Sequence, residues 1–109
     1  MSKRPVDLLL EDIIEAIERI RQYIKGLPFE KFLDDRKTID AVVRNMEIIG
    51  EAANRLPEEF RQNHPEVEWY KVIGLRHRIV HEYFGIDIQI IWQILQKDLP
   101  ELLQKITQM

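Results

Sequence analysis

The stretch RKTIDAVVRNMEIIGEAANRL, residues 36–56, decides the fold. Its apolar residues recur at steps of three and four, the spacing that places them along one face of an α-helix. The members of this stripe are Ile39, Val42, Val43, Met46, Ile49, Gly50, Ala53 and Leu56. Pro57 follows directly, and proline ends or restarts a helix because it has no backbone N–H. The stretch therefore predicts one long helix with a face to bury.

A second apolar series at the same spacing lies on the N-terminal side. Its members are Leu10, Ile13, Ile14, Ile17, Ile20 and Ile24. Acidic residues lead this series and basic residues end it, an order that complements the helix dipole. Gly26 and Pro28 then indicate where the helix ends. The segment PFEKFLDD between the two long helices predicts a single helical turn that carries Phe29, Phe32 and Leu33 into the core.

The C-terminal side begins with PEEFRQNHPEVEW, which predicts a linker with one more helical turn. A third long helix is expected to begin near Val67 and to run through GLRHRIVHEYFGID, residues 74–87, with Gly85 as its stop. Asp87 is placed to cap the last helix. The apolar face of that last helix is Ile88, Ile91, Trp92, Leu95, Leu99, Leu102, Leu103 and Ile106.

Pro100 lies inside the last helical pattern. Asp98 could cap a second helical piece there, so we expect a kink or break. No strand pattern or repeat occurs anywhere in the sequence. The sequence therefore predicts one all-α domain over residues 1–109, an antiparallel bundle of about four main helices with short helical turns.

Composition and charge narrow the functional classes. The chain is 45% hydrophobic and 32% charged, which indicates a folded domain, and it has no cysteine for a disulfide or a thiolate. The net charge is −3, so any contact with RNA must use a local site. No apolar run approaches the ~18 residues of a membrane span. The start MSKRPVDLLLEDII resembles a crude signal peptide, but Glu11 and Asp12 interrupt it, and we expect a cytoplasmic protein.

Residues 74–87 concentrate cations, imidazoles and a phenol among apolar residues. On a helix with ~100° per residue, Arg76 shares the broad face of the core residues. The other members of that face are Trp69, Val72, Ile73, Val80 and Tyr83. A guanidinium buried there needs a carboxylate or a cleft. The commoner, structural interpretation is an ion pair with Glu51, whose neighbours Gly50, Ala52 and Ala53 would permit close helix approach.

His81 follows Arg76 by five residues, or ~140° around a regular helix, so one such helix does not bring the two together. Either the helix ends near His81, or a second copy of the chain completes the site. Histidine moves a proton near neutral pH and arginine stabilises an anionic phosphorane. Together they could cleave RNA by activating its own 2′-hydroxyl, with no metal and no cofactor.

Metal binding is a weaker interpretation of the same stretch. His77 and His81 have the i, i+4 spacing of a metal pair, but two ligands do not make a site. Glu82 or Asp87 would have to contribute, so we predict no metal. His64, in the linker, is expected to be a surface residue.

The spacing of Arg76, four residues, His81, one residue and Tyr83 resembles that of the HEPN superfamily. It is most similar to the HepT-like toxins that are paired with MntA-like minimal nucleotidyltransferase antitoxins. The resemblance covers the whole chain and includes IIGEAANRLP (48–57), HEYFGID (81–87) and DLPEL (98–102). Many HEPN ribonucleases have Asn after the Arg, where this chain has His77.

The resemblance implies an all-helical homodimer with a composite cleft and metal-independent ribonuclease activity that uses Arg76 and His81. It also implies that a nucleotidyltransferase antitoxin adds AMP to Tyr83. We expect His77 and Glu51 to support these residues. The alternative is a non-catalytic helical module that binds a nucleotide or a nucleotidyltransferase partner. The acidic net charge favours this alternative slightly, since RNA is repelled away from the site.

Overall fold

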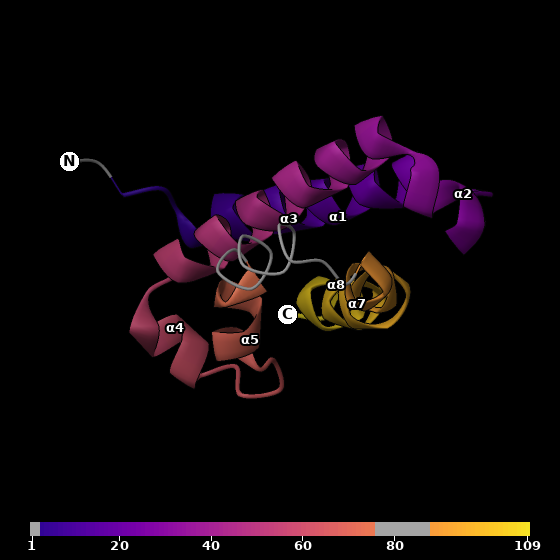
Figure 1. Ribbon diagram of the computed structural model, residues 1–109. Coiled ribbons are helices and arrows are strands. Elements are labelled where there is room, and N and C mark those ends of the chain that lie inside the picture. The colour runs from indigo at the N-terminus through magenta and orange to yellow at the C-terminus, as the bar shows by residue number, and fades with distance from the viewer. Residues whose placement is uncertain (1–2, 76–87) are drawn as a thin grey trace.

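The computed structural model describes residues 3–75 and 88–109 (Figure 1). The helices are α1 (Val6–Ile24), α2 (Phe29–Asp34), α3 (Arg36–Arg55), α4 (Glu58–Gln62), α5 (Trp69–Ile73), α7 (Ile88–Gln93), the π-helical segment η1 (Ile94–Asp98) and α8 (Leu99–Thr107). These two ranges contain no strand, which confirms the all-α class. No helix among the described residues is both long enough and apolar enough to span a membrane.

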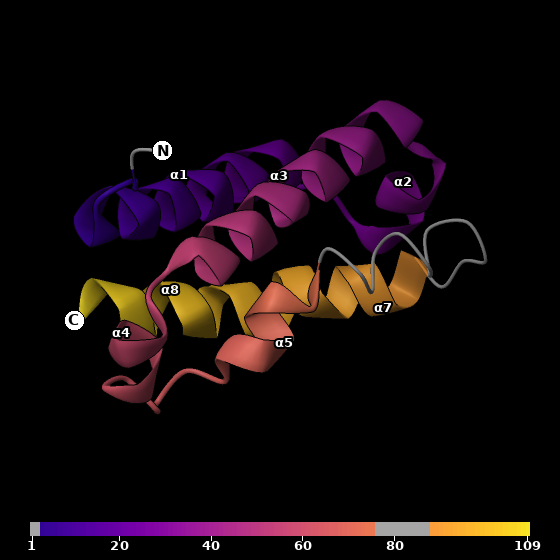
Figure 2. The same cartoon turned by 90° about the vertical axis from the view of Figure 1, so that its left-hand side faces the viewer.

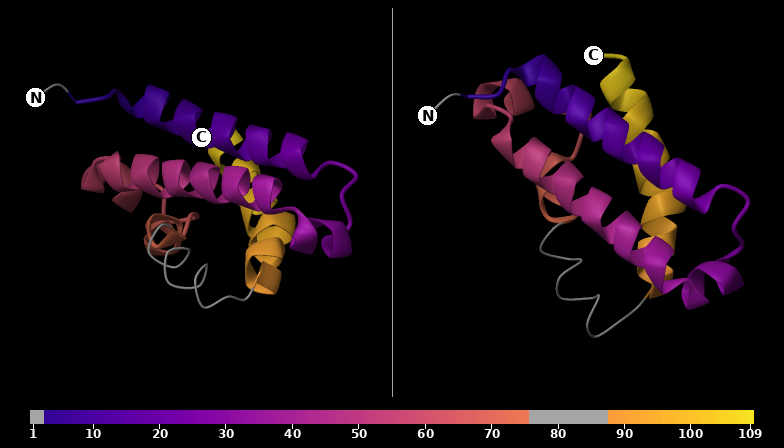
Figure 3. Two further views of the ribbon diagram at one scale, coloured as in Figure 1. Left: turned by 45° about the horizontal axis from the view of Figure 1, so that its top comes forward. Right: turned by 90° about the horizontal axis from the view of Figure 1, so that it is seen from above.

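The helices form two layers. α1 and α3 lie side by side and antiparallel, joined at one end through α2 (Figures 1 and 2). α5 and the rod formed by α7, η1 and α8 lie beneath them. Seen from above, α8 passes under α1 at an angle (Figure 3). The bundle predicted from the sequence is therefore present, with α1, α3 and the C-terminal rod as its long members.

The core lies between these layers and is made by the predicted stripes. Every member of the α3 stripe is buried: Ile39, Val42, Val43, Met46, Ile49, Gly50, Ala53 and Leu56. On α1 the residues Ile13, Ile17 and Ile20 are fully buried, whereas Leu10 and Ile14 pack at its margin. Burial of such side chains is worth about 1.5–3 kcal/mol each, so these two stripes supply most of the drive for the helices to associate.

The turn after α1 follows the sequence prediction. The helix ends at Ile24, and Gly26 adopts a φ of +72°, the left-handed conformation that glycine reaches without strain. The backbone N–H of Leu27 donates to the carbonyl of Ile24 over 2.9 Å and closes the turn. The chain is thereby redirected into α2.

For α2, the prediction that three residues enter the core is wrong for one of them. Phe32 is fully buried and Phe29 is half-buried, but Leu33 is 46% exposed. Leu33 lies about 100° around the helix from Phe32, and a helix of this length buries only one narrow face. The rings of Phe32 and Phe29 pack against Trp92 of α7, with centroid separations of 4.8 and 5.9 Å.

The expected third long helix is shorter in its described part than predicted. It begins at Trp69, two residues after Val67, and α5 ends at Ile73. Gly74 follows as a turn residue with near-helical backbone angles (φ −69°, ψ −11°), its N–H still donates to the carbonyl of Tyr70 over 3.0 Å, and Leu75 is again helical. The predicted continuation of the helix, the stop at Gly85 and the cap at Asp87 lie outside the described residues.

The expected interruption near Pro100 takes a different form from the one predicted. Asp98 has helical backbone angles (φ −68°, ψ −43°) and makes no side-chain capping hydrogen bond, so it is not a cap. The chain instead widens into η1, in which the N–H of Leu99 donates to the carbonyl of Ile94. Pro100 has no N–H, and its ring would clash with the carbonyl four residues earlier in a regular helix. The wider π-helical turn relieves this conflict, and the rod continues without a break (Figure 2).

Candidate functional site

The predicted site residues Arg76, His77, His81 and Tyr83 lie outside the described residues, as do Glu82 and Asp87. The expected gathering of Arg76 with His81 therefore stays a prediction. The structure describes the two elements from which the chain enters and leaves residues 76–87. These are α5 with Leu75 on one side and α7 on the other.

The entry side is fixed by three buried residues at helical spacing. Trp69, Val72 and Leu75 are 7%, 9% and 6% exposed and share the face of α5 that meets the core. The indole Nε1 of Trp69 also donates a hydrogen bond to the carbonyl of His64 over 2.9 Å. The predicted core face is thus confirmed for Trp69 and Val72. Because Arg76 follows Leu75 directly, the chain enters the motif from an anchored position.

His64, which was predicted to be a surface residue, is half-buried. Its ring lies 4.4 Å from the ring of Phe60, and its Nδ1 is 3.2 Å from a carboxylate oxygen of Glu66. The backbone N–H of Glu66, followed by the His64 imidazole, lowers the pKa of the Glu66 carboxyl. His64 therefore organises the connection between α4 and α5. The i, i+4 spacing of Phe60 and His64 was the signal in the sequence.

The exit side is anchored by α7. Ile91 is 1% exposed, and Trp92 packs against Phe32 and Phe29 of α2. Aromatic pairs at these separations are worth about 0.5–1.5 kcal/mol beyond the area they bury. Both ends of the motif therefore connect to well-packed helices, which is the support that a precise arrangement of catalytic side chains needs.

Glu51, the predicted partner of Arg76, is exposed on α3. Its neighbours Ala52 and Ala53 are buried, with exposed fractions of 4% and 0%. α3 packs against both α1 and α5. The small residues thus lie at helix contacts as expected, whereas the pairing of Glu51 with Arg76 stays a prediction.

A buried polar contact between α1 and α3 was not anticipated from the sequence. Asn45 is 5% exposed, and its side-chain oxygen accepts a hydrogen bond from Nε of Arg19 over 2.8 Å. The Asn45 side-chain nitrogen donates to the carbonyl of Ala41 over 2.9 Å. A polar residue inside the apolar pattern of α3 was the available signal, because buried amides are nearly always paired.

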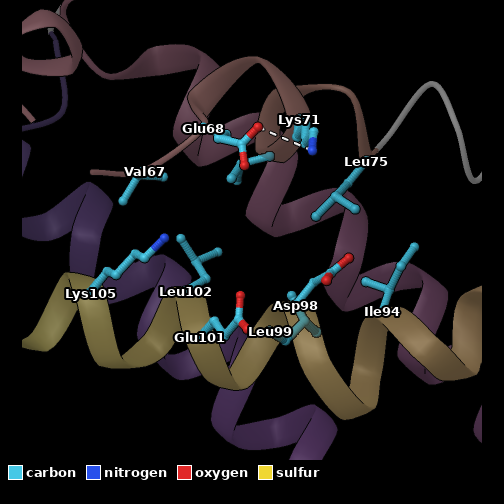
Figure 4. Close-up of a pocket in the computed structure, with 11 residues that line it drawn as sticks. Val67, Glu68, Lys71, Leu75, Ile94, Asp98, Leu99, Glu101, Leu102 and Lys105 are labelled. Carbon is cyan, nitrogen blue, oxygen red and sulfur yellow. Dashed lines mark ion pairs between the residues drawn. The ribbon is translucent and has the colours of Figure 1, made fainter. Parts of the chain in front are cut away.

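A cleft opens between α5 and the C-terminal rod, and we name it the α5–α8 cleft (Figure 4). Its volume is about 140 Å³. Its walls are Val67, Val72, Leu75, Ile94, Leu99 and Leu102, and its rim carries Glu68, Lys71, Asp98, Glu101 and Lys105. Nζ of Lys71 and a carboxylate oxygen of Glu68 are 3.1 Å apart. Lys71 lowers the pKa of Glu68, and Glu68 in turn raises the pKa of Lys71.

Within residues 3–75 and 88–109, no group of three or more His, Asp and Glu side chains is arranged to hold a metal ion. The weakly favoured metal pair, His77 with His81, lies outside these ranges.

Comparison with known proteins gives one consistent result. The family described as Ribonuclease HepT-like matches residues 13–109. A protein of Thermococcus cleftensis named "Probable ribonuclease HepT" is 44% identical over 93 residues, which cover 85% of this chain and 84% of that protein. A protein of Methanocaldococcus jannaschii named "Putative RNase" is 40% identical over 106 residues, covering 97% of this chain and 88% of its own length. No solved structure matches the chain.

The match spans nearly all of the chain, from the middle of α1 to the last residue, and it includes the Arg76, His81 and Tyr83 spacing. The two relatives align over more than four fifths of their own length. The all-α bundle agrees with the fold that the resemblance implied. The chain belongs to the Ribonuclease HepT-like family.

Proposed function

We propose that this chain is a metal-independent endoribonuclease and the toxin of a toxin–antitoxin pair. The observation that carries the proposal is the family match over residues 13–109, which contains Arg76, His81 and Tyr83 at the motif spacing. The names of the relatives, which describe ribonucleases, support the same activity.

The proposed reaction uses the RNA itself as nucleophile. His81 accepts the proton of a 2′-hydroxyl, whose oxygen attacks the adjacent phosphorus, and the bond from phosphorus to the 5′-oxygen breaks. The 5′-oxygen takes a proton, which leaves a cyclic 2′,3′-phosphate and a 5′-hydroxyl end. Arg76 stabilises the additional negative charge on the phosphorane.

A homodimer is part of the proposal. On a regular helix Arg76 and His81 point about 140° apart, so twofold pairing of the motif segments is the simplest way to gather both around one groove. His77 and Glu51 are proposed to support Arg76 and His81 there. The anchoring of α5 through Trp69 and of α7 through Trp92 supports this arrangement, because it holds both ends of the motif segment to the core.

Inactivation by an antitoxin is the third part of the proposal. A nucleotidyltransferase partner adds AMP from ATP to the Tyr83 oxygen and releases pyrophosphate. The added phosphate is an anion that competes with RNA for Arg76, and the nucleoside blocks the groove by volume.

The test of the proposed function is RNA cleavage by the purified protein in the presence of a chelator. Wild type should cleave, and Arg76→Ala and His81→Ala should each lose on the order of 10²–10³ in rate while keeping their helical circular dichroism. Arg55→Ala is the matched control, because Arg55 is an exposed residue at the end of α3. It should cleave like wild type.

The alternatives are separated by the same assay. Cleavage that a chelator abolishes would point to a metal site at His77 and His81. If wild type cleaves no RNA, the binding module for a nucleotide or a nucleotidyltransferase partner replaces the enzyme. Wild-type rates in folded Arg76→Ala and His81→Ala proteins would remove these two residues from the catalytic assignment.

A further inference from the structure

An open groove lies between the C-terminal end of α1 and the rod, and we name it the α1–rod groove. Its volume is about 640 Å³. Its apolar walls include Ile24, Leu27, Trp92 and Leu95, and its polar lining is Arg21 and Gln96. Ile24, Leu27 and Trp92 are only half-buried, so apolar surface stays in contact with water there. Among the described residues no carboxylate lines this groove, although the whole chain carries a net charge of −3.

The helix α2 carries a complementary projection at the same end of the molecule (Figure 2). Leu33 is 46% exposed and lies one turn after Phe29, so the two form a short apolar ridge. Glu30 and Asp34 are exposed and lie beside this ridge, because each directly follows one of its two residues. Lys31 lies about 160° around the helix from Leu33. We name Phe29, Glu30, Leu33 and Asp34 the α2 ridge, which presents an aliphatic side chain beside two negative charges.

The groove and the ridge adjoin each other at Trp92. Its side chain lines the groove, and the centroid of its ring lies 5.9 Å from that of Phe29. Leu33 is therefore the outer end of an apolar strip that leads from α2 across Phe29 and Trp92 into the groove. Single exposed apolar residues are normal on a protein surface, whereas contiguous apolar surface indicates a binding site.

The charges around the two surfaces have opposite signs. Arg21 lines the groove, and Lys25 follows it by one turn. Arg21 lies 3.8 Å from a carboxylate oxygen of Glu18, but both side chains are more than half exposed, so this ion pair contributes little and can be exchanged. Glu30 and Asp34 of the ridge have the same four-residue spacing as the two cations. The acidic α2 ridge thus complements the basic edge of the α1–rod groove.

We propose that this end of the molecule is an interface between two copies of the chain, in which the α2 ridge of each copy lies in the α1–rod groove of the other. Leu33 packs against Leu27 and Trp92 of the other copy, and the carboxylates of the ridge pair with Arg21 and Lys25. Because the ridge and the groove adjoin each other, one twofold axis seats both ridges at once and closes the assembly. The interface uses no residue of the motif segment, so it does not depend on an RNA substrate.

The first test is the mass of the purified protein by sedimentation, from nanomolar to near-millimolar concentration. Wild type should show a twofold step in mass, and Leu33→Gln should move this step to a concentration at least about tenfold higher, because apolar burial is lost at two symmetric contacts. Arg21→Glu should also weaken the association, and Arg21→Glu/Glu30→Arg should regain part of the loss. Tyr70→Gln is the matched control, because Tyr70 is 71% exposed on α5. Its mass step should match that of wild type.

The second test uses the absence of cysteine from the chain. A Leu33→Cys chain and a mass-tagged Gln96→Cys chain, mixed and oxidised, should form a disulfide between the two chains, because Gln96 lines the groove that receives Leu33. Tyr70→Cys mixed with Gln96→Cys is the control for random collisions. A mass step that Leu33→Gln leaves in place, or cross-linking no greater than in the Tyr70 control, overturns the interface and leaves the proposed function untouched.

Discussion

The indole Nε1 of Trp69 donates a hydrogen bond to the backbone carbonyl of His64, five residues earlier, over 2.9 Å. This bond joins the first residue of α5 to the linker after α4, and Phe60 packs near both rings. The position of α5, and with it Leu75 at the wall of the α5–α8 cleft, depends on this contact more than on the helix itself. A helix of five residues has little stability of its own.

Trp69→Phe should therefore destabilise the protein by about 1–3 kcal/mol. The ring still packs, but the His64 carbonyl loses its donor in a site where Trp69 is 7% exposed. Urea denaturation followed by circular dichroism measures the change. Tyr70→Phe is the control, since Tyr70 is 71% exposed and its loss should stay within about 0.5 kcal/mol. Equal stability of the two variants would show that the indole bond contributes nothing.

The contact between Arg19 and Asn45 should appear as a coupling energy. We expect Arg19→Met and Asn45→Ala to destabilise the protein together by less than the sum of their separate effects, with a coupling of about 1 kcal/mol. A double-mutant cycle in urea gives this number. Glu18→Gln with Asn45→Ala is the matched control cycle, because Glu18 is exposed and its carboxylate pairs with Arg21. Strict additivity in the Arg19 cycle would contradict the structure.

Asp35 should make stability depend on pH in the acid range. The Thr38 hydroxyl and then the Thr38 backbone N–H donate to its carboxylate, and both lower the pKa of Asp35 in the folded protein. A lowered folded-state pKa stabilises the fold above the unfolded-state pKa, and this contribution is lost as pH falls through the folded-state value. The melting temperature of Asp35→Ala should lie below that of wild type at pH 7, and the gap should narrow towards pH 3. A difference in melting temperature that grows as the pH falls would contradict this assignment, because it would mean that the pKa of Asp35 is raised in the folded protein.

The proposed composite site requires a dimer. Light scattering at micromolar protein concentration should give twice the mass of 13.1 kDa. The physical reason is the angular separation of Arg76 and His81, which one regular helix does not close. A mixture of inactive Arg76→Ala and His81→Ala chains should regain part of the cleavage rate if each groove takes residues from both copies. A strictly monomeric mass in an active preparation would rule out the shared site.

The acceptor oxygen for AMP can be tested by mass. After incubation with ATP, magnesium and the partner nucleotidyltransferase, wild type should gain one or more AMP units and Tyr83→Phe none. The Phe variant should keep its fold and much of its cleavage, since the ring still packs, and the partner should fail to inactivate it. Tyr70→Phe is the control, because the exposed Tyr70 hydroxyl is an alternative acceptor that the proposal excludes. The same mass gain on wild type and on Tyr83→Phe would place the modification elsewhere.

The sequence was sufficient for the long elements, because their burial repeats over many turns. All eight residues of the α3 stripe are buried, and Gly26 ends α1 with the expected left-handed turn. The periodic spacing of apolar residues was not sufficient in the short helix α2. Phe32 and Leu33 are both apolar, but Phe32 packs against Trp92 and is covered whereas Leu33 is exposed. The prediction that Asp98 caps a new helix was wrong for another reason. A proline inside a helical pattern can be accommodated by a wider π-helical turn as well as by the start of a new helix.

The site was predictable only in its residue types. Arg76, His81 and Tyr83 were selected by spacing and by resemblance, and their geometry stays a prediction. The α5–α8 cleft could not be predicted, because its walls come from α5 and from the C-terminal rod, which are far apart in the sequence. The polar role of Asn45 was missed for the same reason, since its partner Arg19 lies 26 residues away.

The π-helical turn at Ile94–Asp98 has a consequence for how the last helix tolerates length changes. A π-helical turn accommodates about one more residue than the α-helical turn it replaces. Deleting one residue there would tighten the turn, bring the Pro100 ring back against the carbonyl four residues earlier, and rotate α7 by about 100° relative to α8. Trp92 would then turn away from Phe29 and Phe32 of α2, while Leu102 and Ile106 kept their places. The π-helical turn thus fixes the rotation of α7 relative to α8 about the axis of the rod. It lets Trp92 face α2 while Leu102 and Ile106 stay buried in the core.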